Sequence, residues 1–514
     1  MTHTLNTLGR RGFLAAAGSA LAGCDSGMSL TKSPGVCDQP MGKQLIVDIH
    51  CHLMNLRDAD DDAFVVRHFT DADEKGPLAS FVAGLATNIA ALPNHFVTES
   101  GKEEFEWLSS ITKSVQGNPQ AFCNAASNRQ SGLIFAAEGR HVLGFASNRA
   151  RNAALLMDRY PQVDIFTPLM VDFYEGKGPY SHPEELVDFY SQLNVATLGR
   201  FLPMVSFNPA RAWAERDRPP GQRHLDMVRN CIEKKGFVGV KMHPSTGFAP
   251  IENVLYGCPN SPLQKLKSIP EDQAKFYDNI LQDLLVYCRG ADVPILIHSG
   301  EGIPANRGCM QHTFVAHAER PNAPPLWERA IQMANRHQGS DFAGTPVNPE
   351  RRLRFCFGHL AGGFTEVKGR AQPHPWLRMM EGIMRRNPDV YIDLSDFTEP
   401  FEDRSSDRNP RYPHLMKYQD AFRSFLSDNK AVGQNMMYGS DWHMPSVAAV
   451  GKDYLAEIEA MIPEVLRPRT MGLNAIDFLG LAPGRTTRAR LERFYRAKDV
   501  HHRIPWMEKI AAKA

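Results

Sequence analysis

Eight short, apolar, β-type runs recur along this chain, separated by longer stretches whose apolar residues have helical spacing. The runs occupy residues 45–53, 164–173, 201–209, 236–244, 293–300, 354–362, 390–397 and 436–442. Strands that alternate with helices are parallel and are joined by right-handed crossovers. Because there are eight such units, the pattern predicts an α/β protein that forms a closed (β/α)8 TIM barrel. An open, doubly wound sheet of eight strands is the alternative.

Two stretches do not fit a plain barrel. Residues 55–163 are far too many for one connection between a strand and a helix, so we expect a long, partly helical insert after strand 1 that covers the barrel mouth. Beyond residue 445, amphipathic stretches such as 452–462 predict closing and appended C-terminal helices. We therefore assign the barrel and its insert to residues 45–495, followed by a C-terminal tail at residues 496–514.

The composition argues against several classes of protein. With 43% hydrophobic and 22% charged residues among 514, the chain has an ordinary globular composition. The formal net charge is +1 and no cluster of Lys and Arg stands out, so a nucleic-acid partner is not expected. None of the nine cysteines forms a CxxC pair, so neither a thiolate zinc site nor a redox motif is predicted. The sequence leaves the pairing of any disulfides open.

The first 24 residues have the features of an export signal. Arg10 and Arg11 precede an apolar run that ends in the sequence LAGC at Cys24. The run is shorter than the roughly 20 residues that span a bilayer, and it matches a cleaved signal peptide. The paired arginines resemble a twin-arginine (Tat) export signal, and LAGC resembles a bacterial lipoprotein cleavage site. The alternative is a frayed, alanine-rich helix.

This interpretation divides the N-terminus into two parts. Residues 1–23 are the expected signal peptide, and residues 24–44 are the expected tether, with a lipid on Cys24. The mature protein would then be exported and would face the periplasm as a membrane-anchored lipoprotein.

Polar side chains that a buried strand would not ordinarily carry lie at the C-terminal ends of five of the eight runs. They are His50 and His52 after the first run, Lys241 and His243 after the fourth, His298 after the fifth, His359 after the sixth and Asp441 after the eighth. Residues two apart on a strand share a face, and the C-terminal ends of barrel strands surround one mouth. Singly, each residue has an ordinary explanation, such as a backbone hydrogen bond or a helix cap. Jointly, the imidazoles and the carboxylate predict a divalent metal site that keeps a position open for water.

This ordered set of residues resembles the amidohydrolase superfamily. The segments GFVGVKMHP, ILIHSGEG, GHLAGG, YGSDWHMP and NAIDFLGL are similar to the amidohydrolase-related branch that includes aminocarboxymuconate-semialdehyde decarboxylase. The similarity extends over about residues 44–482 and is interrupted by the insert.

The resemblance implies a role for each residue at the barrel mouth. It implies that His50, His52, His298 and Asp441 are metal ligands, with zinc as the expected ion. Asp441 would also take a proton from the attacking water, and His359 would be a catalytic imidazole that polarises the substrate or stabilises the developing oxyanion.

Lys241 has three roles open to it. In two-metal members of the superfamily, a lysine at this position is carboxylated and bridges the ions, and the residue at the place of His359 joins the second ion. Lys241 would otherwise bind a substrate carboxylate, or have a structural role only.

The implied function is that of a metal-dependent hydrolase, which cleaves a C–N or C–O bond of an amide, ester or lactone with a metal-activated water. Two alternatives stay open: a non-hydrolytic metal-dependent decarboxylase or lyase that acts on a carboxylate substrate, and a non-catalytic, membrane-tethered binding protein. The expected partners are a small-molecule substrate and, through the lipid anchor, the membrane. The sequence leaves open the substrate, the number of metal ions and whether the chain forms a homo-oligomer.

Overall fold

The computed structural model describes residues 37, 42, 44–55, 57–58, 99–129, 148–172, 174, 181–256, 269–300, 323–401, 415–442, 445, 453–500 and 502–512. The expected signal peptide, Cys24 and most of the expected tether lie outside the described residues. The helices within the described ranges include none that is both long enough and apolar enough to cross a membrane.

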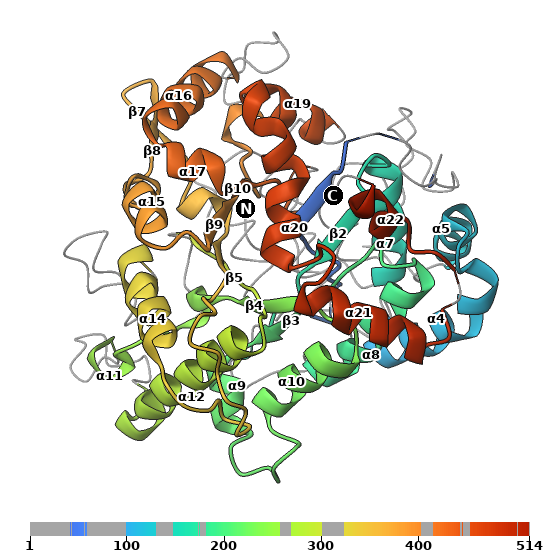
Figure 1. The fold of residues 1–514 in the computed structure, drawn as a ribbon. Coiled ribbons are helices and arrows are strands. Elements are labelled where there is room, and N and C mark those ends of the chain that lie inside the picture. Colours follow the sequence, from blue (N-terminus) through green and yellow to red (C-terminus); the bar gives the residue numbers. More distant parts are fainter. Residues whose placement is uncertain are drawn as a thin grey trace, which may run out of the picture.

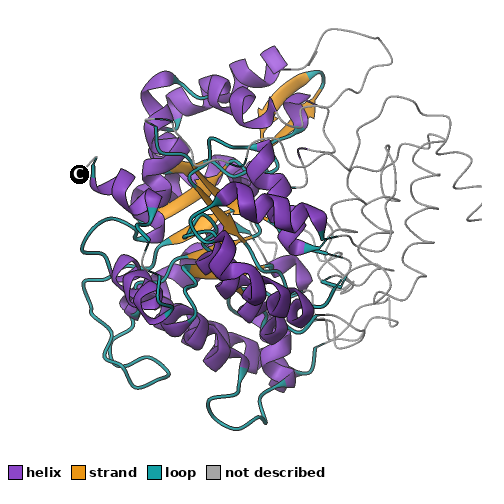
Figure 2. Cartoon of the chain, turned by 90° about the vertical axis from the view of Figure 1, so that its right-hand side faces the viewer, coloured by secondary structure: helices purple, strands orange, loops and turns teal. Residues whose placement is uncertain are grey.

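Within these ranges, eight parallel strands form the centre of the molecule, and helices surround them (Figures 1 and 2). The strands are β1 (Val47–Cys51), β2 (Ile165–Pro168), β3 (Met204–Phe207), β4 (Gly239–Met242), β5 (Ile295–Ile297), β6 (Phe355–Phe357), β9 (Val390–Asp393) and β10 (Met436–Met437). Each lies inside one of the eight predicted runs, so the prediction of eight strands is confirmed. All of them carry buried side chains, as expected for strands covered on both faces.

The strands close into a barrel. Six of the strands form one parallel sheet in the order β10-β9-β6-β5-β4-β3, and β1 pairs with β2. The bridges Phe166–Phe201 and Leu169–Met204 join β2 to β3. The other joint is between β10 and β1, where Ile49 N donates to Tyr438 O at 3.0 Å and Cys51 forms a bridge with Trp442. Neither end of the six-stranded sheet is therefore an open edge, and the alternative of an open sheet is wrong.

The helices that follow the strands lie outside the barrel. They are α8 (Pro183–Ala196), α9 (Pro209–Ala214), α10 (His224–Lys234), α11 (Asn253–Tyr256), α12 (Glu271–Gly290), α14 (Pro324–Arg336), α15 (Pro375–Arg386), α16 (Leu415–Asp428) and α17 (Lys430–Gln434). In α12, for example, Leu281, Leu284, Leu285 and Cys288 have helical spacing and are all buried. Short 3-10 turns, η3 (Pro244–Thr246), η5 (His359–Ala361) and η6 (Glu399–Phe401), follow β4, β6 and β9.

A hairpin of β7 (Phe364–Val367) and β8 (Arg370–Pro373) lies between β6 and α15, and the sequence interpretation did not predict it. Phe364 alone is buried in β7, while the next three residues are exposed. The hairpin turns at Lys368 and Gly369, which both have positive φ. Without a buried apolar run, these strands leave no strand-like pattern in the sequence.

The described part of the insert is helical. It contains α4 (Gly101–Val115), α5 (Pro119–Asn128) and α7 (Arg149–Arg159), and α4 packs on α8 of the barrel. A disulfide joins Cys37, in the segment before β1, to Cys123 of α5. Both the long insert after strand 1 and its partly helical nature agree with the prediction.

A buried arginine connects the insert to the chain that leaves β1. Arg149 of α7 is fully buried, and its guanidinium donates to Asp58 (Nε to Oδ2, 3.0 Å), to Glu104 of α4 (Nη1 to Oε2, 2.5 Å) and to Asn55 (Nη2 to Oδ1, 3.1 Å). Because Asn55 lies only three residues beyond His52, this cluster holds the end of the first strand against two helices of the insert.

The C-terminal helices pack on the barrel in two groups. The first comprises α19 (Tyr454–Met461), η8 (Glu464–Leu466) and η9 (Arg469–Leu473), and the Tyr454 hydroxyl donates to Leu394 O at 2.9 Å, just beyond the carboxyl end of β9. The second comprises α20 (Asn474–Leu479), α21 (Thr486–Ala497) and α22 (Pro505–Ala511), which cover the amino-terminal ends of the strands. Phe478, Leu491 and Trp506 of these helices share one apolar cluster with Val47 and Ile165, the first residues of β1 and β2. The helix α22 and its buried Trp506 lie in the segment assigned above to the C-terminal tail. The opposite, carboxyl ends of the strands are left for a site.

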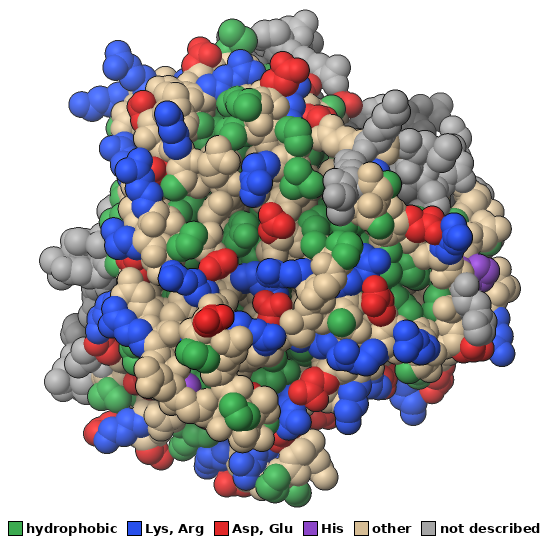
Figure 3. All heavy atoms as spheres, viewed as in Figure 1, with side chains coloured by type: hydrophobic (Ala, Val, Ile, Leu, Met, Phe, Trp, Pro, Cys, Tyr) green, Lys and Arg blue, Asp and Glu red, His purple; other side chains and the backbone are tan. Residues whose placement is uncertain are grey.

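Basic and acidic side chains are interspersed over the face shown in Figure 3, which agrees with a net charge near zero. No large area of one sign is visible on this face.

Replacing Arg149 with methionine should destabilise the protein strongly, because the variant leaves the carboxylates of Asp58 and Glu104 buried without their cation. We expect the free energy of unfolding to fall by about 3–5 kcal/mol, measured by urea denaturation followed with tryptophan fluorescence. The control is Arg229→Met, which breaks an exposed pair with Glu233 at 2.9 Å and should cost less than about 1 kcal/mol. Equal, small losses in both variants would contradict this role of Arg149.

Candidate metal centre

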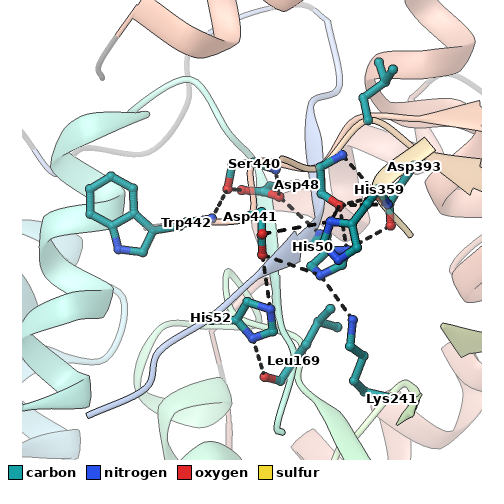
Figure 4. Close-up of polar contacts among 12 residues, drawn as sticks. Asp48, His50, His52, Leu169, Lys241, His359, Asp393, Ser440, Asp441 and Trp442 are labelled. Carbon is teal, nitrogen blue, oxygen red and sulfur yellow. Dashed lines mark hydrogen bonds and ion pairs between the residues drawn. The ribbon is translucent and has the colours of Figure 1, made fainter. Parts of the chain in front are cut away.

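Two histidines and an aspartate converge at the carboxyl end of the barrel (Figure 4). His50 is the fourth residue of β1, His52 follows the strand, and both point toward Asp441, which follows β10. Asp441 Oδ1 lies 3.2 Å from His52 Nε2 and 3.6 Å from His50 Nε2. One ligand atom from each of the three residues lies within 4.8 Å of the other two. Cys51, between the histidines, is fully buried in the core.

Hydrogen bonds indicate which nitrogen of each imidazole carries the hydrogen. His52 Nδ1 lies 3.1 Å from Leu169 O, and a carbonyl oxygen can only accept, so this nitrogen must be the donor. His50 Nδ1 lies 2.9 Å from Asp393 Oδ2. Burial alone would raise the pKa of Asp393, but the charge and hydrogen bond of His50 hold that pKa well below its ordinary value. An ionised carboxylate also only accepts, so His50 Nδ1 carries a hydrogen as well, and Nε2 is the ring nitrogen that each histidine directs toward Asp441.

The donor atoms of this arrangement suit a divalent cation. Burial, followed by the charge of Lys241, lowers the pKa of His50 to about 3, so His50 is neutral. The Nε2 atoms of His50 and His52 face the carboxylate of Asp441, and Lys241 Nζ approaches His50 Nε2 from the side. Imidazole nitrogens and a carboxylate oxygen are also the donors that zinc and similar divalent ions prefer, so the residues fit the predicted metal.

Lys241 lies at the base of this cluster, on β4 (Figure 4). Its Nζ is 3.2 Å from His50 Nε2, and the residue is only 1% exposed. Burial lowers the pKa of Lys241 to about 8. The structure therefore brings Lys241 to the same nitrogen that would bind a metal ion.

The remaining histidines form a row of rings beside His50. The ring centroids of His50 and His359 are 4.7 Å apart, those of His359 and His298 are 4.4 Å apart, and His298 stacks on His243 at 4.2 Å. Among the described residues, two groups have ligand atoms within 4.8 Å of one another: His50, His52 and Asp441, and His359, Asp396 and Asp441. His298, a metal ligand by family resemblance, belongs to neither group and lies against His359 instead.

Asp393 and Ser395 orient the imidazoles, and the sequence interpretation missed both. Asp393, the last residue of β9, accepts hydrogen bonds from His50 Nδ1 and from the backbone N of His359 (3.0 Å). The hydroxyl of Ser395 donates to Asp393 Oδ1 at 2.5 Å and lies 3.1 Å from His359 Nδ1. Carboxylates in this position fix the tautomer and raise the basicity of a metal-binding histidine. A signal was present in the sequence, since Asp393 is an acidic residue within the seventh run, as Asp441 is within the eighth.

Asp48 holds the loop that carries Asp441. It is buried in the middle of β1 and accepts from Ser440 N (2.9 Å), Ser440 Oγ (2.6 Å) and His50 N (3.2 Å). Burial raises the pKa of Asp48 to about 7. Asp441 itself has a φ of 49°, a left-handed conformation that is costly outside glycine and persists only where neighbours enforce it. The backbone N of Asp441 donates to His50 O at 2.7 Å. This bond and the contacts between Asp48 and Ser440 therefore both connect the segment after β10 to β1, the strand with the two histidines.

Replacing Asp393 with asparagine should weaken divalent-metal binding about 10–100-fold, because the amide oxygen can accept from His50 Nδ1 but lacks the negative charge that raises the basicity of the imidazole. The dissociation constant for Zn²⁺, measured by competition with a chromophoric chelator, checks this. The control is Asp389→Asn, immediately before β9 and at its other end, which should leave the constant unchanged. Equal affinities of the Asp393 variant and the wild type would contradict the assignment.

Comparison with known proteins identifies the family of this chain. The sequence model of the amidohydrolase family matches residues 208–481, while no curated protein matches the chain. Among solved structures, a zinc-bound amidohydrolase of Burkholderia multivorans is 13% identical, with a TM-score of 0.35 over 64% of this chain and 87% of the other. The 5-carboxyvanillate decarboxylase of Sphingomonas paucimobilis is 11% identical, with a TM-score of 0.35 over 74% and 96% of the chains.

The glucuronate isomerase of Caulobacter crescentus is 13% identical, with a TM-score of 0.37 over 91% of this chain and 94% of the other. The assignment depends on the sequence match alone, which extends from the end of β3 to the residues after α20 and includes Lys241, His298, His359 and Asp441. Because it covers more than half of the chain, this protein belongs to the amidohydrolase family of metal-dependent enzymes.

Proposed function

We propose that this protein is a metal-dependent hydrolase that cleaves a C–N or C–O bond next to a carbonyl group, in an amide, ester or lactone. The observation that carries the proposal is the convergence of two imidazole nitrogens, the Nε2 atoms of His50 and His52, on the carboxylate of Asp441. These residues would hold the ion, which we propose to be zinc, with His298 as the fourth ligand that the family resemblance implies. When bound, such an ion polarises a carbonyl oxygen and makes a water molecule acidic enough to lose its proton near neutral pH.

Asp441 is the proposed general base. Its Oδ1 faces the two histidines of β1, while its Oδ2 faces His359, 3.9 Å from Nδ1. A carboxylate with one oxygen directed away from the histidines can accept a proton from the attacking water and hand it to the leaving group. The Asp48–Ser440 contacts hold this carboxylate in place through its backbone.

His359 is the proposed source of positive charge opposite the attacked carbonyl. The hydroxyl of Ser395 donates to Asp393, so it accepts from His359 Nδ1, and His359 Nε2 is left bare. This nitrogen is buried and has no hydrogen-bond partner in the described part of the chain. Once protonated, it would stabilise negative charge on the carbonyl oxygen.

The nature of the products tests this proposal against decarboxylation. The full-length protein, purified in detergent and loaded with Zn²⁺, would be assayed on panels of amides, esters, lactones and aromatic carboxylic acids in H₂¹⁸O. Hydrolysis predicts one ¹⁸O atom in the product and no carbon dioxide. Carbon dioxide released without ¹⁸O incorporation would overturn hydrolysis in favour of a decarboxylase, and a metal-loaded protein inert on every panel would oppose both.

On any substrate that is turned over, Asp441→Asn should lower kcat about 10²–10⁴-fold, because the amide cannot accept the proton. The Asp389→Asn variant is again the matched control and should keep the wild-type kcat. A kcat for Asp441→Asn within twofold of the wild type would contradict its role as general base.

We also propose that the protein is exported and anchored in the membrane through a lipid on Cys24. Support comes from the disulfide between Cys37 and Cys123, since disulfides form and persist mainly in oxidising compartments such as the periplasm.

Expression of the full chain in a bacterium that has Tat export and lipoprotein processing should place it in the membrane fraction. The variant Cys24→Ser should shift it to the fraction without membranes, whereas the matched variant Cys258→Ser should not. An unchanged distribution of Cys24→Ser would contradict the anchor.

A further inference from the structure

We propose that the disulfide between Cys37 and Cys123 is a redox switch that positions the candidate metal ligands of the first strand, so that the site reaches its full metal affinity only when the two thiols are oxidised. The inference rests on the proposed function, because it concerns the ion that His50 and His52 would hold. The disulfide joins residues 86 apart in the sequence, and the loop that it closes contains β1 and both histidines. Two sets of contacts, made by the helix α7, connect the sulfurs to these ligands.

The disulfide packs on α7 of the insert. Cys37 and Cys123 are fully buried, and their sulfurs lie 3.8 and 3.9 Å from Ala154 O, in the middle of this helix. The backbone N of Cys37 also donates to Gln120 Oε1 of α5 at 3.0 Å. The disulfide therefore holds three segments against one another: the chain before β1, the helix α5 and the helix α7.

The helix α7 in turn holds the chain that leaves β1. Asn152, which is fully buried, donates from Nδ2 to Met54 O at 3.1 Å. One turn earlier in the helix, Arg149 Nη2 donates to Asn55 Oδ1 at 3.1 Å. Because both acceptors lie within three residues of His52, a shift of α7 relative to the barrel would move the segment that fixes the position of this histidine.

His52 is the ligand that such a shift would affect most, because it follows the end of β1. His50 lies inside the strand, where pairing with β2 and the contact with Asp393 hold it. The ring of His52 is held by the bond from Nδ1 to Leu169 O alone among the neutral partners, and its backbone N donates to Trp442 O. Metal sites tolerate only small changes in the distances to their ligands. The affinity for a metal ion should therefore depend on where α7 lies.

Formation of the disulfide requires an oxidant from outside the chain. When the S–S bond forms, the thiols of Cys37 and Cys123 give up two protons and two electrons. A disulfide of a thiol-oxidising protein takes them up and becomes a dithiol. Such oxidants act in compartments like the periplasm, whereas the cytoplasm keeps thiols reduced. Together with the proposed export, the switch would keep metal affinity low before export and raise it afterwards.

The affinity for Zn²⁺ tests the switch. The full-length wild type, the double variant Cys37→Ser/Cys123→Ser and the control Cys231→Ser would be purified in detergent, freed of metal and titrated with Zn²⁺ against a chromophoric chelator. Cys231 is a buried free cysteine in α10, outside the insert. We expect the double variant to bind Zn²⁺ about 5–150-fold more weakly, the range typical of coupling between two sites, and the control to bind like the wild type.

Reduction of the wild type is a reversible form of the same measurement. Treatment with a phosphine reductant, removed by desalting without oxygen, should lower the Zn²⁺ affinity to that of the double variant, and reoxidation should restore it. The double variant should not respond to this treatment, which controls for effects of the reductant on the other cysteines.

A further variant separates positioning of the ligands from a loss of stability. Asn152→Leu removes the hydrogen bond to Met54 O and leaves both cysteines in place. If the disulfide acts through α7, Asn152→Leu should also weaken Zn²⁺ binding, and removing the disulfide from this variant should cost less affinity than removing it from the wild type. The visible spectrum of bound Co²⁺, which reports coordination geometry, should change in the same variants well below their Tm. A loss of stability alone would lower Tm and leave this spectrum unchanged.

The outcomes distinguish the switch from the proposed function. Equal Zn²⁺ affinities and identical Co²⁺ spectra of the wild type and the double variant would overturn the switch and leave the proposed function intact. Fully additive effects of Asn152→Leu and disulfide removal would overturn the path through α7. A double variant that is unfolded at the temperature of the titration would overturn the switch as well, because the whole fold would then need the disulfide. A wild type that binds no Zn²⁺ in either redox state would overturn the proposed function too.

Discussion

The contact between β1 and the segment after β10 is the interaction on which the rest of the site depends. Asp48 accepts two hydrogen bonds from Ser440, and the backbone of Asp441 donates to His50. These bonds close the barrel, and they also bring the last ligand of the chain to the first two. A closed barrel has no exposed sheet edge, so one set of contacts serves both stability and function.

The barrel mouth concentrates buried polar groups that hydrogen bonds hold in fixed orientations. Hydrogen bonds from Nδ1 to Leu169 and Asp393 direct the Nε2 atoms of His52 and His50 toward the carboxylate of Asp441. Lys241 Nζ lies 3.2 Å from His50 Nε2 and brings a positive charge to the same place. Metal binding to these donors would add to the stability of the fold, so occupancy of the site and stability should be coupled.

The outer parts of the molecule support this mouth from two sides. The last three helices, α20 to α22, pack on the amino ends of the strands, while the insert holds the chain after His52 through Arg149. Positioning of the first ligand pair thus depends on an insert that begins only a few residues further along the chain. This gives a physical reason why α7 carries a fully buried arginine, Arg149, with two carboxylate partners, Asp58 and Glu104.

The sequence by itself determined the barrel and the positions of its principal candidate ligands. Apolar runs report burial directly, and polar residues at their ends stand out, so eight strands and the positions of His50, His52 and Asp441 could be read from the pattern alone. The exposed hairpin β7–β8 buries too little to leave such a pattern.

Only the tertiary structure decided which residues are partners. Asp393 meets His50 across 343 residues of sequence, and Asp48 meets Ser440 across 392. The tertiary structure also places His298 beside His359, and Asp396 near Asp441. Such pairings follow from strand neighbourhood and side-chain direction in the closed barrel, and periodicity along one strand carries no information about them.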